Sequence, residues 1–162
     1  MRSILREKSQ DFFSILKYDK ANWIDFWNEY CQENREFMCG YTQTLGLSDK
    51  KVESILTNTE RPFLDKIKQK NEQIKHLKLK AAKTLNQFSK ELELTKEDFV
   101  LYLIGALGIT DTISFNNKDC IIVLIDIVAL YKNNKIEELQ DIVLLSAKKA
   151  RKNINEKTLE GF

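Results

Sequence analysis

The chain has 162 residues, of which 43% are hydrophobic and 31% charged, and its formal net charge is +2. This composition is typical of a globular protein and excludes a disordered one, and the length suits a single domain spanning residues 1–162. The small net charge gives no reason to expect a nucleic acid or a membrane surface as a partner.

The first residues carry charges throughout and lack the apolar core of a secretory signal. The longest apolar run, Ile121–Ile125, is far too short to span a bilayer. The three cysteines, Cys31, Cys39 and Cys120, are odd in number and have no CxxC spacing, which favours reduced thiols. We therefore expect a cytoplasmic protein.

Residues 1–58 are predicted to form helices, because aromatic and other apolar side chains recur there at helical spacing. This stripe, interrupted only at Asn34, consists of Trp23, Phe26, Trp27, Tyr30, Phe37, Met38 and Tyr41. We interpret it as a face that packs into the core rather than as a ligand site. Gly46 ends this segment, and Ser48 is predicted to cap a short helix through Leu56.

A long helix is predicted to open the second part of the domain, residues 60–162. It begins near Pro62, a residue well suited to a first helical turn, and continues for about thirty residues. Its apolar face consists of Phe63, Ile67, Ile74, Leu77, Ala81, Leu85, Phe88 and Leu92.

After Thr95 the apolar pattern changes from helical spacing to short runs of strand length. The predicted strands lie near 98–105, 112–116 and 120–125. The polar turn Asn116–Asp119 joins the last two as a hairpin, and a short helical piece and a last helix from about Lys135 follow. The fold class is therefore α+β and helix-rich, with long N-terminal helices, a small three-stranded antiparallel sheet and a C-terminal helix.

An all-α bundle is the alternative fold. The runs "FVLYLIGAL" and "CIIVLIDIVAL" are short enough to be buried helices, and periodicity alone does not separate a buried strand from a buried helix. The two folds differ in whether residues 98–125 contain any strand.

The sequence contains no motif that indicates a catalytic residue, a metal site or a cofactor site. His76 is the only histidine, and it lies between Lys75 and Lys78 in the long predicted helix. Catalytic zinc needs about three protein ligands, which a single histidine among lysines does not provide. The segment "GALGIT" lacks the third glycine of a dinucleotide-binding turn. We therefore expect no metal, no cofactor and no catalytic residue that can be named.

Basic residues are frequent in the long helix and cluster near the end of the last one. The second cluster consists of Lys148, Lys149, Arg151 and Lys152. The lysines of the long helix are spread around it rather than aligned, and cations near a helix C-terminus also complement the helix dipole. We interpret both as solvated faces and keep weak nucleic-acid binding as an alternative.

From Lys78 onward the chain resembles the core of bacterial zincin-type zinc peptidases. The resemblance rests on the order helix–strand–hairpin–helix, on "LYLIG" and on the pair Leu144–Leu145, which in that family precedes a His-Glu-x-x-His turn. It implies that "CIIVLID" borders a substrate cleft and that the last helix corresponds to the active-site helix. The residues at the positions of the two histidines and the glutamate are Ala147, Lys148 and Arg151. The zinc-binding motif is therefore absent.

Two classes of function follow. The first is a non-catalytic interaction or regulatory protein, a degenerate zinc-peptidase-like domain that binds a peptide or protein partner. If the zincin-like order holds, strand 120–125 lies at a sheet edge, where an extended peptide would add as a further strand. The alternative is that a loop or the N-terminal helices cover this edge. The expected partner-binding residues are Cys120, Ile122 and Leu124, which share one face of that strand. The second class is a small enzyme with an Asp, Glu, Lys and Cys site that no motif reveals, and the missing catalytic motifs favour the first.

Overall fold

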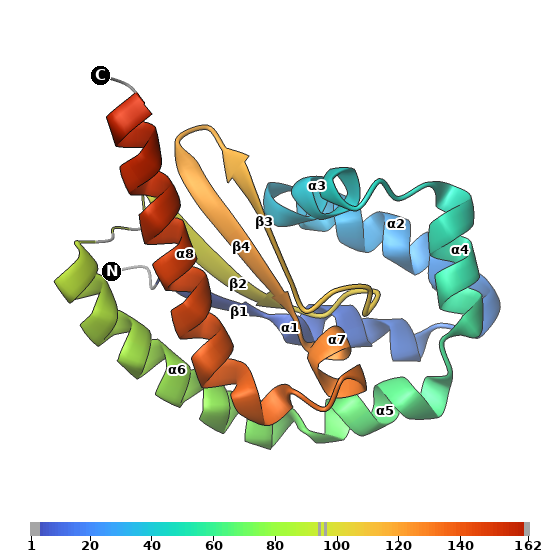
Figure 1. Ribbon diagram of the computed structural model, residues 1–162. Helices are drawn as coiled ribbons and strands as arrows, with labels where there is room; N and C mark the ends of the chain where they lie inside the picture. Colours follow the sequence, from blue (N-terminus) through green and yellow to red (C-terminus); the bar gives the residue numbers. More distant parts are fainter. Residues whose placement is uncertain (1–3, 94, 96, 161–162) are drawn as a thin grey trace.

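The computed structural model describes residues 4–93, 95 and 97–160. Helices lie on both faces of a four-stranded mixed sheet with the strand order β1-β2-β4-β3 (Figure 1). The strands are β1 (Leu5–Lys8), β2 (Phe99–Ile104), β3 (Thr112–Asn117) and β4 (Cys120–Asp126). β1, β2 and β4 run parallel, and β3 pairs antiparallel with β4.

The N-terminal part is helical, as the spacing of its apolar residues predicts. Its helices are α1 (Ser9–Phe12), α2 (Trp23–Glu33), α3 (Arg35–Thr44) and α4 (Asp49–Asn58), with short 3-10 helices at Phe13–Lys17 and Lys20–Asn22. The aromatic stripe spans two helices because the chain bends at Asn34, and all seven of its side chains are buried. The predicted cap of α4 is confirmed, since Ser48 Oγ accepts a hydrogen bond from the Lys51 N–H at 3.2 Å.

The predicted thirty-residue helix is two helices, α5 (Arg61–Gln69) and α6 (Asn71–Leu92). Pro62 lies in the first turn of α5, as predicted. The break falls at Lys70, where φ is −80° and ψ is 4°, and it lets α5 pack against α7 (Ile127–Lys132) while α6 packs against α8 (Leu139–Glu160). A 3-10 turn at Ile136–Glu138 leads into α8, close to the predicted start.

The helix-rich α+β fold is confirmed, and the all-α alternative is wrong, because all three predicted strands form. The prediction of a three-stranded antiparallel sheet is wrong in two respects. The charged segment Leu5–Lys8 adds a fourth strand beside β2, and β2 pairs with β4 in parallel. The expectation that strand 120–125 lies at a sheet edge is also wrong, because β4 lies between β2 and β3.

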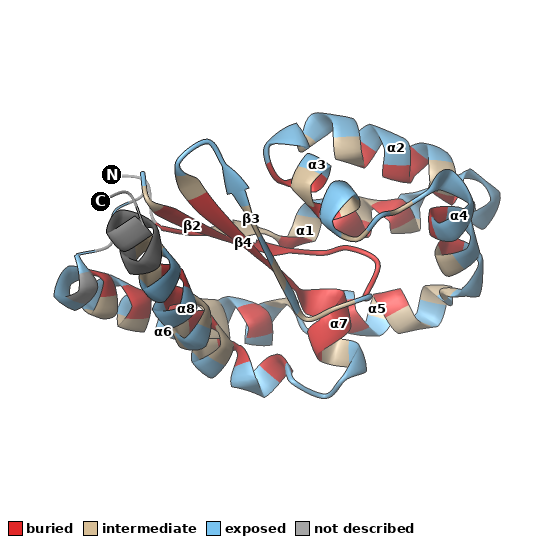
Figure 2. Cartoon of the chain, turned by 45° about the horizontal axis from the view of Figure 1, so that its top comes forward, coloured by how far each residue is buried: buried red, intermediate tan, exposed pale blue. Residues whose placement is uncertain are grey.

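The physical reason for this order is the pattern of apolar residues in each strand. β2 and β4 are buried almost throughout, whereas exposed and half-buried residues alternate along most of β3 (Figure 2). A strand that is apolar on both faces is stable only in the interior of a sheet, and one with alternating polarity suits an edge. β4 therefore takes the central position and β3 the exposed one.

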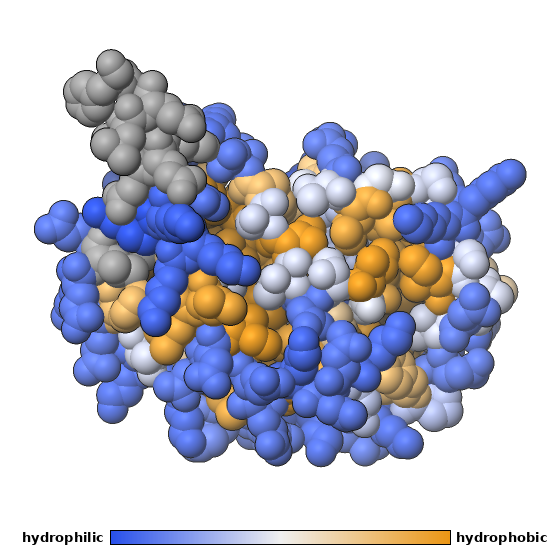
Figure 3. All heavy atoms as spheres, viewed as in Figure 1, coloured by the Kyte–Doolittle hydropathy of each residue, from blue (hydrophilic) through white to orange (hydrophobic). Residues whose placement is uncertain are grey.

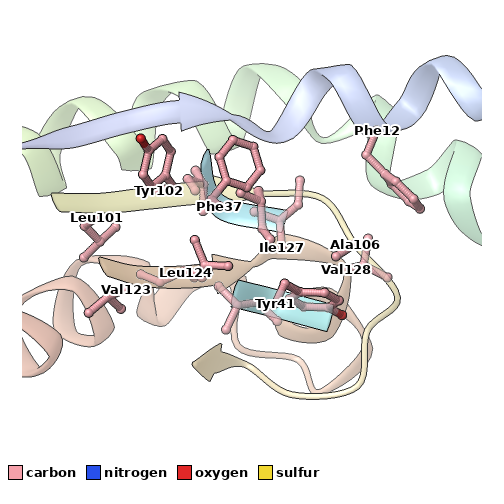
Figure 4. Packing of buried hydrophobic residues seen from close by; sticks show 14 of the residues in the cluster. Phe12, Phe37, Tyr41, Leu101, Tyr102, Ala106, Val123, Leu124, Ile127 and Val128 are labelled. Atoms are coloured by element: carbon pink, nitrogen blue, oxygen red, sulfur yellow. The ribbon is translucent and has the colours of Figure 1, made fainter. Parts of the chain in front are cut away.

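The two faces of the sheet contact different helices. On one face, Tyr102 of β2 packs against Phe37 of α3 with ring centroids 4.8 Å apart (Figure 4). On the other face, α8 packs against β2 and α6. β3 is fixed from the α3 side, since a Cβ at Gly40 would overlap the Phe115 ring.

Candidate functional site

The edge strand β3 presents polar residues on the face that it shares with α8. The register pairs Ser114 with Val123 and Phe115 with Ile122, and Phe115 lies against α3. Directly opposite residues share a face, so Ser114 and Val123 point to the α8 side. Thr112, Ser114 and Asn116 alternate with Ile113 and Phe115 and are all exposed. α8 therefore leaves β3 uncovered.

The backbone of β3 has a free side. The N–H of Asp126 donates to the carbonyl of Asp111 at 3.0 Å, which makes these opposite residues a hydrogen-bonded pair. Such pairs alternate along an antiparallel ladder, so the N–H and C=O of Ser114 and Asn116 point away from β4. Thr112 shares this orientation, although its carbonyl already accepts a bond from the Thr110 hydroxyl at 3.3 Å. Among the described residues, none forms a hydrogen bond with the backbone of Ser114 or Asn116 on this outer side.

A groove of about 330 Å³ lies between this strand and α8. We call it the β3–α8 groove. Its lining consists of Asp111, Thr112, Ile113, Ser114, Ile121, Val123, Lys135, Glu138, Ile142, Leu145, Ser146, Lys149, Ala150 and Asn153. Apolar side chains are visible at the surface between α8 and β3 (Figure 3), and Leu145 is 54% exposed. Short polar side chains on β3 and apolar ones on α8 and β4 thus form the opposite walls.

One end of the β3–α8 groove carries a fixed ion pair. The Lys135 ammonium donates to the Asp111 carboxylate at 3.0 Å, and the Asn133 amide donates to the other oxygen at 2.8 Å. Partial burial raises the pKa of Asp111, but these two hydrogen bonds outweigh it and hold the pKa below its ordinary value. Glu138 stands at the same end and Lys149 further along α8, and both side chains are exposed.

The expected partner-binding residues Cys120, Ile122 and Leu124 lie on the opposite face of the sheet. Ile122 and Leu124 are 5% and 1% exposed and face α3, and Cys120 is half-buried. The side chains of β4 that line the β3–α8 groove are those of Ile121 and Val123. Part of the signal was in the sequence, because a long apolar run belongs in the middle of a sheet.

The helix positions at which a zincin motif would fall do not line the groove. Ala147 is fully buried, and the Lys148 ammonium lies 5.4 Å from the centroid of the Phe88 ring in α6. Arg151 is half-buried, and His76 is exposed on α6. Within the described part of the chain, no group of three or more His, Cys, Asp or Glu side chains could hold a metal ion.

A second hollow of about 470 Å³ lies beside the loop that follows β2, and its lining, drawn from that loop and from α1, α4, α5 and α7, is mostly apolar. The loop directs its N–H groups elsewhere. Those of Ala106 and Gly108 donate to the Asp126 carboxylate, at 3.0 and 2.8 Å, and that of Leu107 donates to the Tyr41 hydroxyl at 3.3 Å. The N–H groups of these three loop residues are therefore not directed at a ligand in the hollow.

Asp126 is a structural residue that the sequence analysis did not single out. It caps α7 by accepting the Val128 N–H at 2.9 Å, and it is only 2% exposed. Burial raises its pKa to about 6, although the N–H donors of Gly108, Val128 and Ala106 act in the opposite direction. An aspartate between an apolar strand and a helix is a capping signal that the sequence does contain.

No helix among the described residues is long and apolar enough to cross a membrane. No protein-family model matches the chain, and neither a curated protein nor a solved structure matches it.

Proposed function

We propose that this protein is a non-catalytic binding protein that takes up an extended peptide segment of a partner along the free edge of β3. The observation that supports this is the outward direction of the Ser114 and Asn116 backbone, on the side of β3 that points away from β4, together with the partly apolar β3–α8 groove on the α8 face of the same strand. In strand addition the backbone hydrogen bonds supply affinity, and pockets for alternate side chains supply selectivity.

The β3–α8 groove is suited to this binding mode, and among the described residues it lacks the ligand set of a zinc peptidase. Peptide cleavage by zinc needs His, Glu, Asp or Cys ligands and a base, whereas the groove-lining residues of α8 are Ile142, Leu145, Ser146, Lys149, Ala150 and Asn153. The proposed function therefore fits a degenerate zinc-peptidase-like domain that has kept a peptide cleft. Cys31, Cys39 and Cys120 form no disulfide among the described residues, which accords with a cytoplasmic place for it.

A proline substitution tests the proposal. Because the Ser114 N–H points away from β4, Ser114→Pro removes no bond of the sheet, yet it deletes an outward donor and blocks the edge. Ser114→Ala is the matched control, since it changes the side chain and leaves the backbone donor. Peptides of random sequence are selected by display against the intact chain, and their affinities are measured for the three proteins.

We expect the selected peptides to bind the wild type and Ser114→Ala alike and to lose about tenfold or more in affinity for Ser114→Pro, the loss of about one to two hydrogen bonds. In amide hydrogen exchange, Ser114 and Asn116 should exchange fast alone and slowly with peptide, whereas Phe115 is protected in both cases. Equal binding by the proline variant would overturn the proposal. So would a dimer of the free protein that the proline variant abolishes, because the edge would then pair with a second copy.

A further inference from the structure

We infer that the β3–α8 groove selects one charge polarity in its peptide: a carboxylate toward the amino end, an apolar residue in the middle and a cation toward the carboxyl end. This inference rests on the proposed peptide binding and adds the chemistry of the bound segment. It follows from the charges at the two ends of the groove, from their separation and from the direction of β3.

The two ends of the β3–α8 groove have opposite net charge. At one end the carboxylates of Asp111 and Glu138 stand with the single ammonium of Lys135, which leaves one negative charge in excess. Asp111 is already satisfied by Lys135 and Asn133, so the exposed Glu138 carboxylate is the group that a ligand cation would meet. At the other end Lys149 is exposed, and among the described residues it has no carboxylate within ion-pair distance.

The separation of these charges sets the spacing of the peptide. Eleven positions separate Glu138 from Lys149, which corresponds to about 16 Å at a helical rise of about 1.5 Å per residue. An extended strand covers that distance in about five residues. Side chains on one face of a strand are an even number of residues apart, so the two charged residues of the peptide should be about four or six positions apart.

The direction of β3 sets the polarity. β3 begins beside Asp111, at the Glu138 end of the groove, and runs toward the hairpin that follows Asn117, beside which the later turns of α8 lie (Figure 1). An added strand pairs more favourably when it is antiparallel. Its amino end then lies near Lys149 and its carboxyl end near Glu138.

The middle of the β3–α8 groove is apolar. Leu145 lies between the two charged ends of the groove on α8, is 54% exposed and faces the hollow whose floor includes Ile121 and Val123. An aliphatic side chain on the α8 face of the added strand, placed two residues after its carboxylate, would extend over the short Thr112 and Ser114 side chains toward this surface. Burial of such surface would supply affinity, while the terminal charges would set the direction.

Two peptides of identical composition test the inference. They are the capped nonapeptides Ser-Gly-Glu-Thr-Leu-Thr-Lys-Gly-Ser and its reverse, Ser-Gly-Lys-Thr-Leu-Thr-Glu-Gly-Ser. Each is titrated into the intact protein and followed by amide chemical shifts. We expect the first to bind about fivefold more tightly at low salt, because exposed pairs contribute little each, and the difference to vanish near about 0.5 M salt.

A charge-exchanged protein completes the test. The double variant Glu138→Lys with Lys149→Glu should prefer the reverse peptide, whereas Lys148→Glu, whose ammonium lies over Phe88 and outside the groove lining, should leave the preference unchanged. Circular dichroism checks that both variants are folded. If both peptides bind equally and Ser114→Pro still weakens them, the charge inference fails and the proposed function stands. Preference of the wild type for the reverse peptide overturns the polarity, and binding of neither overturns both proposals.

Discussion

Asp126 holds the loop that follows β2, and replacing it with asparagine measures how much stability this arrangement supplies. Its Oδ1 accepts the N–H groups of Ala106 and Val128 at 3.0 and 2.9 Å, and its Oδ2 accepts that of Gly108 at 2.8 Å. The side chain is only 2% exposed, so water does not replace these bonds when one is lost.

In the Asp126→Asn variant the new side chain would keep an oxygen toward two of the three donors and would turn its amide N–H₂ toward the third. Two donors would then face each other in the core, and each unpaired buried donor costs about 1–3 kcal/mol. We therefore expect Asp126→Asn to lower the free energy of unfolding by about 2–4 kcal/mol at pH 7. The matched control is Asp111→Asn, which also loses hydrogen bonds but lies near the surface, and its cost should stay below about 1 kcal/mol.

The raised pKa of Asp126 also predicts the direction in which stability changes with pH. The pKa of Asp126 is raised from 3.8 to about 6, mainly by burial, so the folded state binds the proton more tightly than the unfolded state. The stabilisation of the fold that results from this raised pKa is fully present below about pH 3.8 and is lost as the pH rises through about 6. Across this pH window the free energy of unfolding should fall by about 3 kcal/mol through Asp126 alone. The stability advantage of the wild type over Asp126→Asn should therefore be larger at pH 4 than at pH 7.

Urea unfolding followed by tryptophan fluorescence is a suitable assay, because Trp23 and Trp27 are 1% and 3% exposed and will report on loss of the core. A cost for Asp126→Asn no greater than that for Asp111→Asn would show that the carboxylate does not hold the loop. An advantage of the wild type that grows with pH would show that the N–H donors outweigh burial.

Two further predictions concern packing and metal. Gly40→Ala should cost about 1–3 kcal/mol in urea unfolding because the new methyl group overlaps the Phe115 ring, and Phe115→Leu in the same chain should recover part of that loss. A Gly40→Ala protein as stable as the wild type would mean that β3 is not fixed through this contact. The purified protein should hold no stoichiometric zinc and cleave no peptide, because Ala147, Lys148 and Arg151 supply no ligand, and elemental analysis showing one tightly bound zinc per chain would contradict this.

The helices were largely predictable because their signals are local. The periodic aromatic residues of α2 and α3, the Ser48 cap and Pro62 all lie within a few residues of the backbone that they influence. The break at Lys70 was not predictable, because it falls in the polar stretch "KQKNEQ", which is equally compatible with the exposed surface of a continuous helix. What separates α5 from α6 is the different packing of the two helices, which is a tertiary effect.

The sheet was predictable only in part, for the same reason. β1 has the sequence Leu-Arg-Glu-Lys and becomes a strand through its pairing with β2, more than ninety residues away. No local sequence pattern predicts this long-range pairing. The prediction of the site failed together with that of the sheet. Because the edge strand is β3 and not β4, the residues of β4 that line the groove are Ile121 and Val123 and not Cys120, Ile122 and Leu124. The alternation of exposed and half-buried residues along β3 is typical of such an edge position.

A strand that accepts a partner has to keep its shape while its edge is empty, and β3 is fixed in two places away from that edge. Gly40 admits the Phe115 ring against α3, and Asp111 is held by Lys135 and Asn133 just before the strand begins. The strand has only six residues, and Thr112, Ser114 and Asn116 are polar, which disfavours unspecific association of exposed edges. A preorganised edge lowers the entropy lost when a peptide binds. Loosening β3 through Gly40→Ala should therefore weaken peptide binding even though residue 40 lies on the face opposite the β3–α8 groove.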